Sequence, residues 1–213
     1  MLRFRFTLIA FGFVLLYLGY NDASLTLRNQ EPLTIDLRTL INEGAPREWL
    51  HITGGHQNLD EAISTSGQAE RFDAMLIPLV PNPEDSKFHV LVETRDPELL
   101  EFLYTYHFGF DSVFAREQFR EEEAETFRAP WEVTGMLTSG RVAANNREKL
   151  FELAEAVDLN ISDNVVLVTE GKTPARFRGF FFLAMGAAGL IKGFLMFRRP
   201  STKPTTPQQA DNQ

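Results

Sequence analysis

Two apolar stretches at opposite ends of this 213-residue chain constrain its fold more than any other feature. The C-terminal stretch, Phe177 to Phe197, contains only two charged residues, Arg178 at its edge and Lys192. A helix that crosses a bilayer needs about 20 mostly apolar residues. Because Lys192 lies near the end of the stretch, its stem can carry the ammonium group to the headgroups. We therefore predict a transmembrane helix over residues 177–199.

The N-terminal apolar stretch, Phe6 to Tyr20, is shorter and follows a short basic start. A secretory signal peptide has the same pattern, but its cleavage site prefers small residues at positions −3 and −1. Cleavage after Ala23 would place Asn21 at position −3. We therefore expect an uncleaved signal anchor, a transmembrane helix over residues 1–21. If cleavage does occur, the mature protein has one span and the same water-facing domain.

Charge is divided between the middle of the chain and its ends. Between Asn21 and Arg176 there are 28 acidic and 14 basic residues, a net charge of −14, and the remaining ends carry +6. An acidic middle argues against nucleic-acid binding, which needs clustered cations. Basic ends beside apolar stretches fit contact with anionic headgroups, so we expect the lipid bilayer as a partner.

The cations that precede the first apolar stretch predict its orientation, because loops rich in lysine and arginine stay in the cytoplasm. We expect both termini in the cytoplasm, at a bacterial inner membrane. Residues 22–176 would then form an extracytoplasmic, periplasmic domain. Residues 200–213 are polar and proline-rich, which predicts a disordered cytoplasmic tail.

The domain between the spans alternates strand-like and helix-like patterns. Strands are predicted for short segments rich in β-branched residues: Leu33–Ile35, Trp49–Thr53 ending at Gly54-Gly55, Asp73–Val80, Phe88–Thr94, Trp131–Thr138 and Asn164–Thr169. The turn sequence PNPEDSK between the third and fourth of these predicts a hairpin.

Helices are predicted after Asp96, which can cap a helix with Pro97 at its first position, and over residues 145–157. A further helix is predicted within 110–127, with Phe110, Phe114 and Phe119 packed inward and the acidic residues facing water. These patterns predict an α+β fold: a small mixed domain of five or six strands and two or three helices between two transmembrane helices.

The second apolar stretch also contains Gly186, Gly189 and Gly193, and the last two form a GxxxG sequence. Small residues one turn apart let two helices approach closely in lipid. We therefore predict that these glycines pack against another helix, either the first span or a partner, which includes self-association. The alternative is that they reflect only the general abundance of small residues in membrane spans.

The search for chemistry yields one weak group of candidate metal ligands, His51, His56 and Asp60, in and after the sequence HITGGH. Zinc sites usually need three or four ligands at recognisable spacing, and the absence of cysteine excludes thiolate sites, so we expect no cofactor. The GKT at Gly171 lacks the glycine of a phosphate-binding loop, because Val166 stands at that position. We therefore expect no nucleotide partner.

These observations favour a non-catalytic integral membrane protein whose membrane-proximal extracytoplasmic domain contacts other membrane proteins. Such a protein would serve as an accessory or assembly factor. One alternative is an envelope hydrolase or metal-dependent enzyme that uses the region of His51, His56 and Asp60. Another alternative is an envelope sensor that relays a signal through its spans.

Overall fold

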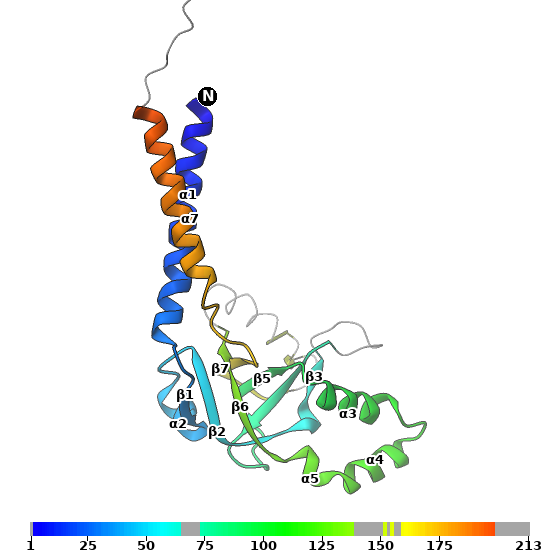
Figure 1. Ribbon diagram of the computed structural model, residues 1–213. Helices are drawn as coiled ribbons and strands as arrows, with labels where there is room; N and C mark the ends of the chain where they lie inside the picture. The colour runs from blue at the N-terminus through cyan, green and yellow to red at the C-terminus, as the bar shows by residue number, and fades with distance from the viewer. Residues whose placement is uncertain (1, 65–72, 139–150, 153, 156–158, 199–213) are drawn as a thin grey trace, which may run out of the picture. The chain divides into compact units, whose positions relative to one another are not determined.

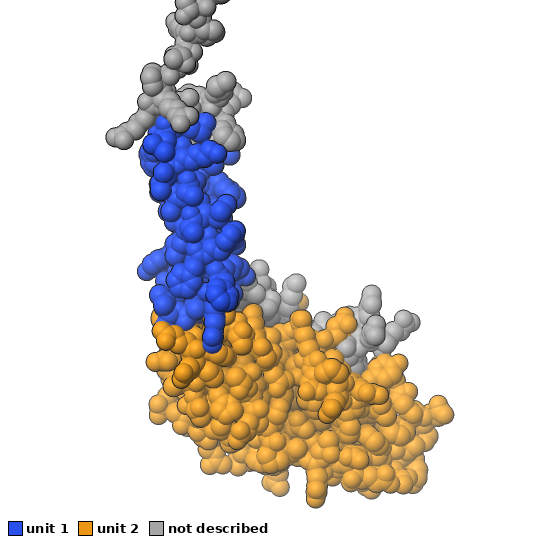
Figure 2. All heavy atoms as spheres, in the orientation of Figure 1, with its two compact units in different colours: residues 1–27, 175–213 blue, residues 28–174 orange. Residues whose placement is uncertain are grey.

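The computed structural model describes residues 2–64, 73–138, 151–152, 154–155 and 159–198. The chain divides into two compact units, which Figure 2 shows in different colours. Unit 1 combines the two ends of the chain, residues 1–27 and 175–213, and unit 2 is the intervening domain, residues 28–174. The predicted tail, 200–213, lies outside the described residues, as does most of the helix predicted over 145–157.

Unit 1 is a pair of helices, α1 (Leu2–Arg28) and α7 (Arg178–Arg198). Segments of both helices, Phe6–Arg28 and Arg178–Met196, are long and apolar enough to cross a membrane by length and composition. Helix α1 continues beyond the predicted boundary at residue 21. The two helices lie side by side (Figure 1).

Unit 2 is a mixed α/β domain. Its described residues form seven strands in one sheet: β1 (Leu33–Asp36), β2 (Trp49–Gln57), β3 (Ile63–Ser64), β4 (Met75–Val80), β5 (Phe88–Thr94), β6 (Pro130–Leu137) and β7 (Ile161–Glu170). The predicted number was five or six, and the strand without a sequence signal is the two-residue β3. The helices whose bounds lie within the described residues are α2 (Leu37–Glu43), α3 (Pro97–Phe108), α4 (Val113–Glu122) and α5 (Ala124–Phe127), with the 3-10 turn η1 (Leu59–Glu61).

Five of the strands close into a ring. The order β1-β2-β6-β7-β5-β4-β3 contains an additional pairing of β2 with β4, so that β2, β6, β7, β5 and β4 form a small barrel. The predicted β4–β5 hairpin is confirmed as an antiparallel pair. By contrast, β1 with β2 and β5 with β7 are parallel pairs, which makes the sheet mixed.

A β-bulge at Gly54 explains how β2 can take part in two pairings along one edge. The register against β6 shifts between Ile52 and Gly55, and Gly54 has φ of 70°, a backbone conformation that favours glycine. The first part of β2 pairs with β1, and its last two residues pair with β4. The strand predicted to stop at Gly54 therefore continues to Gln57, because the extra residue bends the strand instead of ending it.

The barrel encloses the main hydrophobic core. Buried side chains from all five ring strands meet there with two residues of α2: Leu37, Leu40, Leu50, Ile52, Leu79, Val90, Val92, Val133 and Val168. Trp131 packs against this core and also against a second cluster beneath α3 and α5, built on Leu59, Met75, Ile77, Leu103 and Phe127. Each buried aliphatic side chain contributes about 1.5–3 kcal/mol by leaving water, so these clusters stabilise the barrel.

The chain enters and leaves the domain at one end of the sheet. Leu33 at the start of β1, Leu50, Gly135 and Glu170 at the end of β7 form a single row across four strands. Three interstrand spacings separate the first and last of these, or about 14 Å. Asn29 fixes the entry point, because its buried amide accepts from the Trp49 backbone N–H and donates to Glu48.

Helices α3, α4 and α5 form an arm beside the barrel (Figure 1). Asp96 caps α3 by accepting from the backbone N–H groups of Glu98 and Leu99, and Pro97 stands at the first helical position, as predicted. The polar hydroxyl of Ser112 caps α4 in the same way by accepting from the Ala115 N–H. Both helices therefore begin at residues whose side chains satisfy otherwise unpaired N–H groups.

Candidate functional site

The helix pair of unit 1 is closely packed along a seam of glycines. The buried glycines recur every seven residues on both helices: Gly12 and Gly19 on α1, and Gly179, Gly186 and Gly193 on α7. A Cβ atom added at Gly186 would lie 2.9 Å from the Gly12 carbonyl oxygen and 2.9 Å from the Leu16 nitrogen. The two backbones thus approach more closely than any side chain at this position would allow.

The seven-residue spacing distinguishes the glycines of α7 from one another. A Cβ atom at Gly193 would lie 2.7 Å from the Ile9 side chain, whereas a Cβ atom at Gly189 would lie 3.8 Å from its nearest neighbour, the Gly12 Cα atom. Gly186 therefore requires the absence of a side chain, because backbone atoms lie against it. At Gly193 the Ile9 side chain would have to shift, and Gly189 has room for a methyl group. A repeat of seven residues is typical of left-handed helix pairs, whereas GxxxG is typical of right-handed ones.

An ion pair joins the two helices at one end of the seam. Arg178, the first residue of α7, donates from Nε to the Asp22 carboxylate at 2.6 Å. Arg178 is largely exposed, so the pair contributes mainly to helix register. Asp22 and Arg178 lie at the ends of the apolar segments, where polar headgroups would surround them in a bilayer.

The structure does not bring together the three candidate metal ligands. His51 and His56 pair with Thr134 and Pro130, four rows apart on β6, so the bulge leaves both imidazoles on one face. Four residues along a strand, at a rise of about 3.3 Å each, place the two histidines roughly 13 Å apart. Two ligands of one metal ion lie much closer together than this. Within the described residues, no group of three histidine, aspartate or glutamate side chains is arranged to hold a metal ion.

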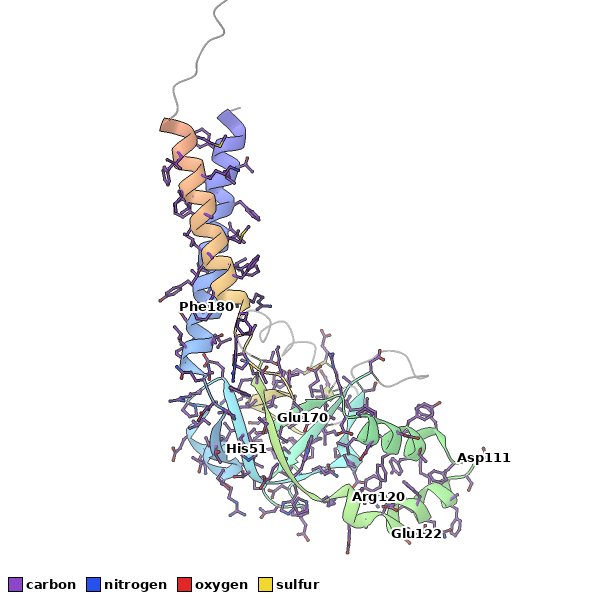
Figure 3. The ribbon with its side chains drawn as sticks, in the orientation of Figure 1. His51, Asp111, Arg120, Glu122, Glu170 and Phe180 are labelled. Atoms are coloured by element: carbon purple, nitrogen blue, oxygen red, sulfur yellow. The ribbon has the colours of Figure 1, made fainter. Side chains whose placement is uncertain are left out.

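The two histidines instead have separate surroundings. His51 is half-buried; its Nδ1 lies 2.8 Å from the Thr134 hydroxyl and its Nε2 lies 3.6 Å from a Glu132 carboxylate oxygen (Figure 3). The Nδ1 atom of His56 is buried and has no hydrogen-bond partner among the described residues. Neither arrangement gives the convergent geometry of a catalytic histidine with an orienting partner and a nucleophile.

Asp60 belongs to an ion-pair cluster with two arginines. Its Oδ1 accepts from Arg120 Nε at 2.7 Å, and its Oδ2 accepts from Arg128 at 3.0 Å and from Arg120 at 3.3 Å. Burial disfavours the charged carboxylate, but the hydrogen bonds from Arg120 and Arg128 outweigh it, so the pKa of Asp60 lies below its ordinary value. Asp60 is consequently a structural anion that ties η1 to the arm, and a poor general base.

Arg128 extends this cluster to the β4–β5 loop, because it also donates to the backbone carbonyl of Pro83.

A surface hollow of about 340 Å³ beside the cluster is lined by Asp60, Ser64 and His107, among others. Both oxygens of Asp60 accept from guanidinium groups, so this carboxylate serves the ion-pair cluster. The ion-pair cluster could not be predicted from sequence spacing, because Arg120 and Arg128 lie 60 and 68 residues after Asp60.

The inner side of the arm is a cluster of aromatic rings. Phe119 of α4 contacts Phe102 of α3 and Phe110, with ring centroids 5.4 Å and 5.0 Å apart. Phe127 contacts Phe102 and Tyr106 at 5.3 Å and 4.9 Å in edge-to-face geometry. Such ring pairs add about 0.5–1.5 kcal/mol each beyond their burial. They connect the three helices of the arm to the buried side chains below.

The far end of the arm, in contrast, leaves apolar side chains in water. Val113 is 74% exposed and Phe114 is 80% exposed, and Tyr104 and Phe108 on α3 are also exposed, with ring centroids 5.2 Å apart. We call these four residues the arm tip; Asp111, labelled in Figure 3, lies between them in sequence. The prediction that Phe114 packs inward is wrong. Phe114 and Phe119 are five residues apart, or about 140° around a helix, so only one of them can face inward.

A second hollow, of about 430 Å³, lies between α2 and the β4–β5 loop and is lined by Arg38, Lys87 and His89, among others. Arg38 donates to the Asn82 side chain at 2.9 Å, and the Asn82 backbone N–H is held by Asp85. Arg38 and Lys87 are exposed, and Asp85 offsets part of their charge. This arrangement is typical of a solvated surface.

Comparison of the chain with protein-family models, with curated proteins and with solved structures gives no match.

Proposed function

We propose that this chain is a non-catalytic integral membrane protein, an accessory or assembly factor whose water-facing domain contacts other membrane proteins. The observation that carries this proposal is the exposure of apolar side chains at the arm tip, above all Val113 and Phe114, on an arm whose inner side is well packed. Exposed apolar surfaces rimmed by polar residues are typical of protein interaction sites.

The helix pair supports the membrane part of the proposal. Both helices are apolar over the length of a bilayer, and large apolar side chains such as Phe11, Phe181 and Phe194 are exposed on them. Lipid is a suitable solvent for these side chains and water is not. We further propose that the membrane is a bacterial inner membrane, with both termini cytoplasmic and the domain in the periplasm, because cations precede the first span.

The interaction is tested by cross-linking in native membranes, followed by extraction in mild detergent and capture of the tagged chain at its natural abundance. We expect one or two membrane proteins in near-equal amount. The control carries the same tag and both helices, but an unrelated soluble domain replaces residues 28–174. Recovery of the chain as a clean monomer, or of the same proteins with the control, would contradict the proposal.

The orientation is tested with protease and intact spheroplasts. We expect cleavage within residues 28–174 without lysis, while a C-terminal epitope after Arg198 is protected until the cells are broken. Digestion of the epitope in intact spheroplasts together with survival of the domain would show the opposite orientation.

A further inference from the structure

The outer face of α4 combines an apolar end with a line of acidic residues. Phe114, Glu117, Gln118 and Glu121 are spaced at i, i+3, i+4 and i+7, so they follow one another along a single side of the helix. All four are exposed, and no residue of α4 is fully buried. Figure 3 shows Glu122 on the outer side of α4 and Arg120 on the side that faces α3.

We propose that the arm tip and this acidic face together form a docking site for a second protein, one that presents an apolar pocket bordered by lysine or arginine side chains. The proposal rests on the proposed function and specifies the chemistry of the partner. Its basis is charge complementarity along α4, beside two large side chains, Val113 and Phe114, that nothing in the described domain covers.

The charge of the arm is strongly one-sided. Residues 97–128 contain eight acidic residues and three arginines, a net charge of 3 − 8 = −5. Two of the arginines, Arg120 and Arg128, are paired with Asp60, and Arg120 also donates to Glu117 at 3.2 Å, so Glu121 and Glu122 supply most of the unneutralised charge of this face. The pKa of His107 lies below its ordinary value because partial burial and the nearby Arg116 disfavour the imidazolium, so His107 adds no charge at neutral pH. A partner that meets this face must therefore supply positive charge.

The same charge argues against the two other occupants of an exposed apolar tip. An anionic bilayer surface attracts basic segments, and it would repel the acidic face of α4. A second copy of this chain would bring a domain of net charge −14 against another of the same charge. A basic protein surface is the occupant for which both the apolar end and the acidic face are favourable.

The architecture of the arm suits it to this role. The rings on its inner side hold α3 and α4 together, and the Asp60 cluster fixes α4 to η1. A partner that binds a surface held in place loses little conformational entropy. Aromatic side chains that enter a pocket at the centre of an interface commonly dominate its affinity, which singles out Phe114.

The test places a photoreactive phenylalanine analogue at position 114 of the full-length chain in native membranes. The matched control places it at Arg47, an exposed position on the turn before β2. We expect position 114 to cross-link to one protein, and mass spectrometry to locate the adduct in a peptide with several lysine or arginine residues. The control position should not give this adduct.

Charge variants supply the second readout. The double variant Glu121→Lys/Glu122→Lys should lower the yield of the adduct at least tenfold. The control Glu31→Lys/Glu43→Lys, at exposed acidic residues elsewhere in the domain, should leave the yield within twofold. Raising the salt concentration from 50 to 300 mM should lower the yield with the unmodified chain and leave that of the charge-reversed chain nearly constant. Equal thermal melting of the variants shows that the domain remains folded.

The outcomes separate this inference from the proposed function. Cross-linking of position 114 to lipid, to a second copy of the chain, or to a partner segment without cations would overturn the docking site. If a stoichiometric partner is captured but cross-links only at other positions, the docking site fails and the proposed function stands. If no position yields a protein partner, both fail.

Discussion

The glycine seam of unit 1 makes a quantitative prediction through the pair Gly186→Ala and Gly189→Ala. Both substitutions add one methyl group to the same helix, one turn apart. The added Cβ atom at Gly186 meets three atoms at 2.9 Å, the Gly12 oxygen and the nitrogen and Cγ of Leu16. The one at Gly189 meets nothing closer than 3.8 Å.

The structure gives the size of the difference. Ordinary van der Waals contact begins at 3.4 Å, so alanine at Gly186 would push the helices apart by 3.4 − 2.9 = 0.5 Å. Because two of the contacted atoms are backbone, no side-chain rotation can relieve the overlap. Overpacking of this kind costs about 1–3 kcal/mol. Alanine also gains about 1 kcal/mol over glycine in helix propensity, and this gain is common to both variants.

We therefore expect Gly189→Ala to change the free energy of unfolding by about 0 to +1 kcal/mol. Gly186→Ala should be about 1–3 kcal/mol less stable than Gly189→Ala. The measurement is unfolding of the full chain in mixed micelles by titration with a denaturing detergent, followed by circular dichroism. A difference below about 0.5 kcal/mol would show that the helices do not meet along Gly12 and Gly186.

Two further predictions concern carboxylates of unit 2. Asp60→Asn should lower the free energy of unfolding of the full chain by about 1–3 kcal/mol in chemical denaturation at pH 7, because Arg120 and Arg128 lose a charged acceptor. The control Glu61→Gln, at the exposed neighbouring residue, should lower it by less than about 0.5 kcal/mol. Because the pKa of Asp60 is lowered in the folded state, its contribution to folding stability is present above the unfolded pKa and disappears as the pH falls through the folded pKa. If Asp60→Asn loses stability toward acid pH as steeply as the unmodified chain, this prediction is wrong. The pKa of Glu170 is shifted in the opposite direction, because burial raises it despite the hydrogen bond from Thr94. Folding stability should therefore fall as the pH rises from the unfolded pKa through the folded pKa. Glu170→Gln should flatten the fall in stability that begins at the unfolded pKa of glutamate and continues to higher pH, and an unaltered slope would refute the assignment.

The strands show why part of the fold could be predicted from the sequence. Phe88–Thr94 has alternating and β-branched residues between clear turn signals, and β5 has these same bounds. The two-residue β3 has no period to detect. The continuation of β2 beyond Gly54 depends on a bulge, and a Gly-Gly pair is equally typical of a turn that ends a strand.

The candidate site was less predictable, because it depends on contacts that are distant in sequence. His51 and His56 are close in the chain, yet an extended strand keeps them apart. Asp60, which was grouped with them, is instead bonded to Arg120 and Arg128. The exposure of Phe114 follows from the side of α4 that packs on α3, and helical periodicity alone does not show which side faces the domain.

The position of β7 in the sheet has a consequence for synthesis. This strand is the last of the domain to leave the ribosome, yet it lies between β6 and β5 and pairs with both. Until residues 161–170 emerge, those two neighbours present bare edges that are prone to aggregate. The nascent domain therefore completes its barrel only as the second apolar helix follows, so closure of the barrel and synthesis of α7 coincide in time.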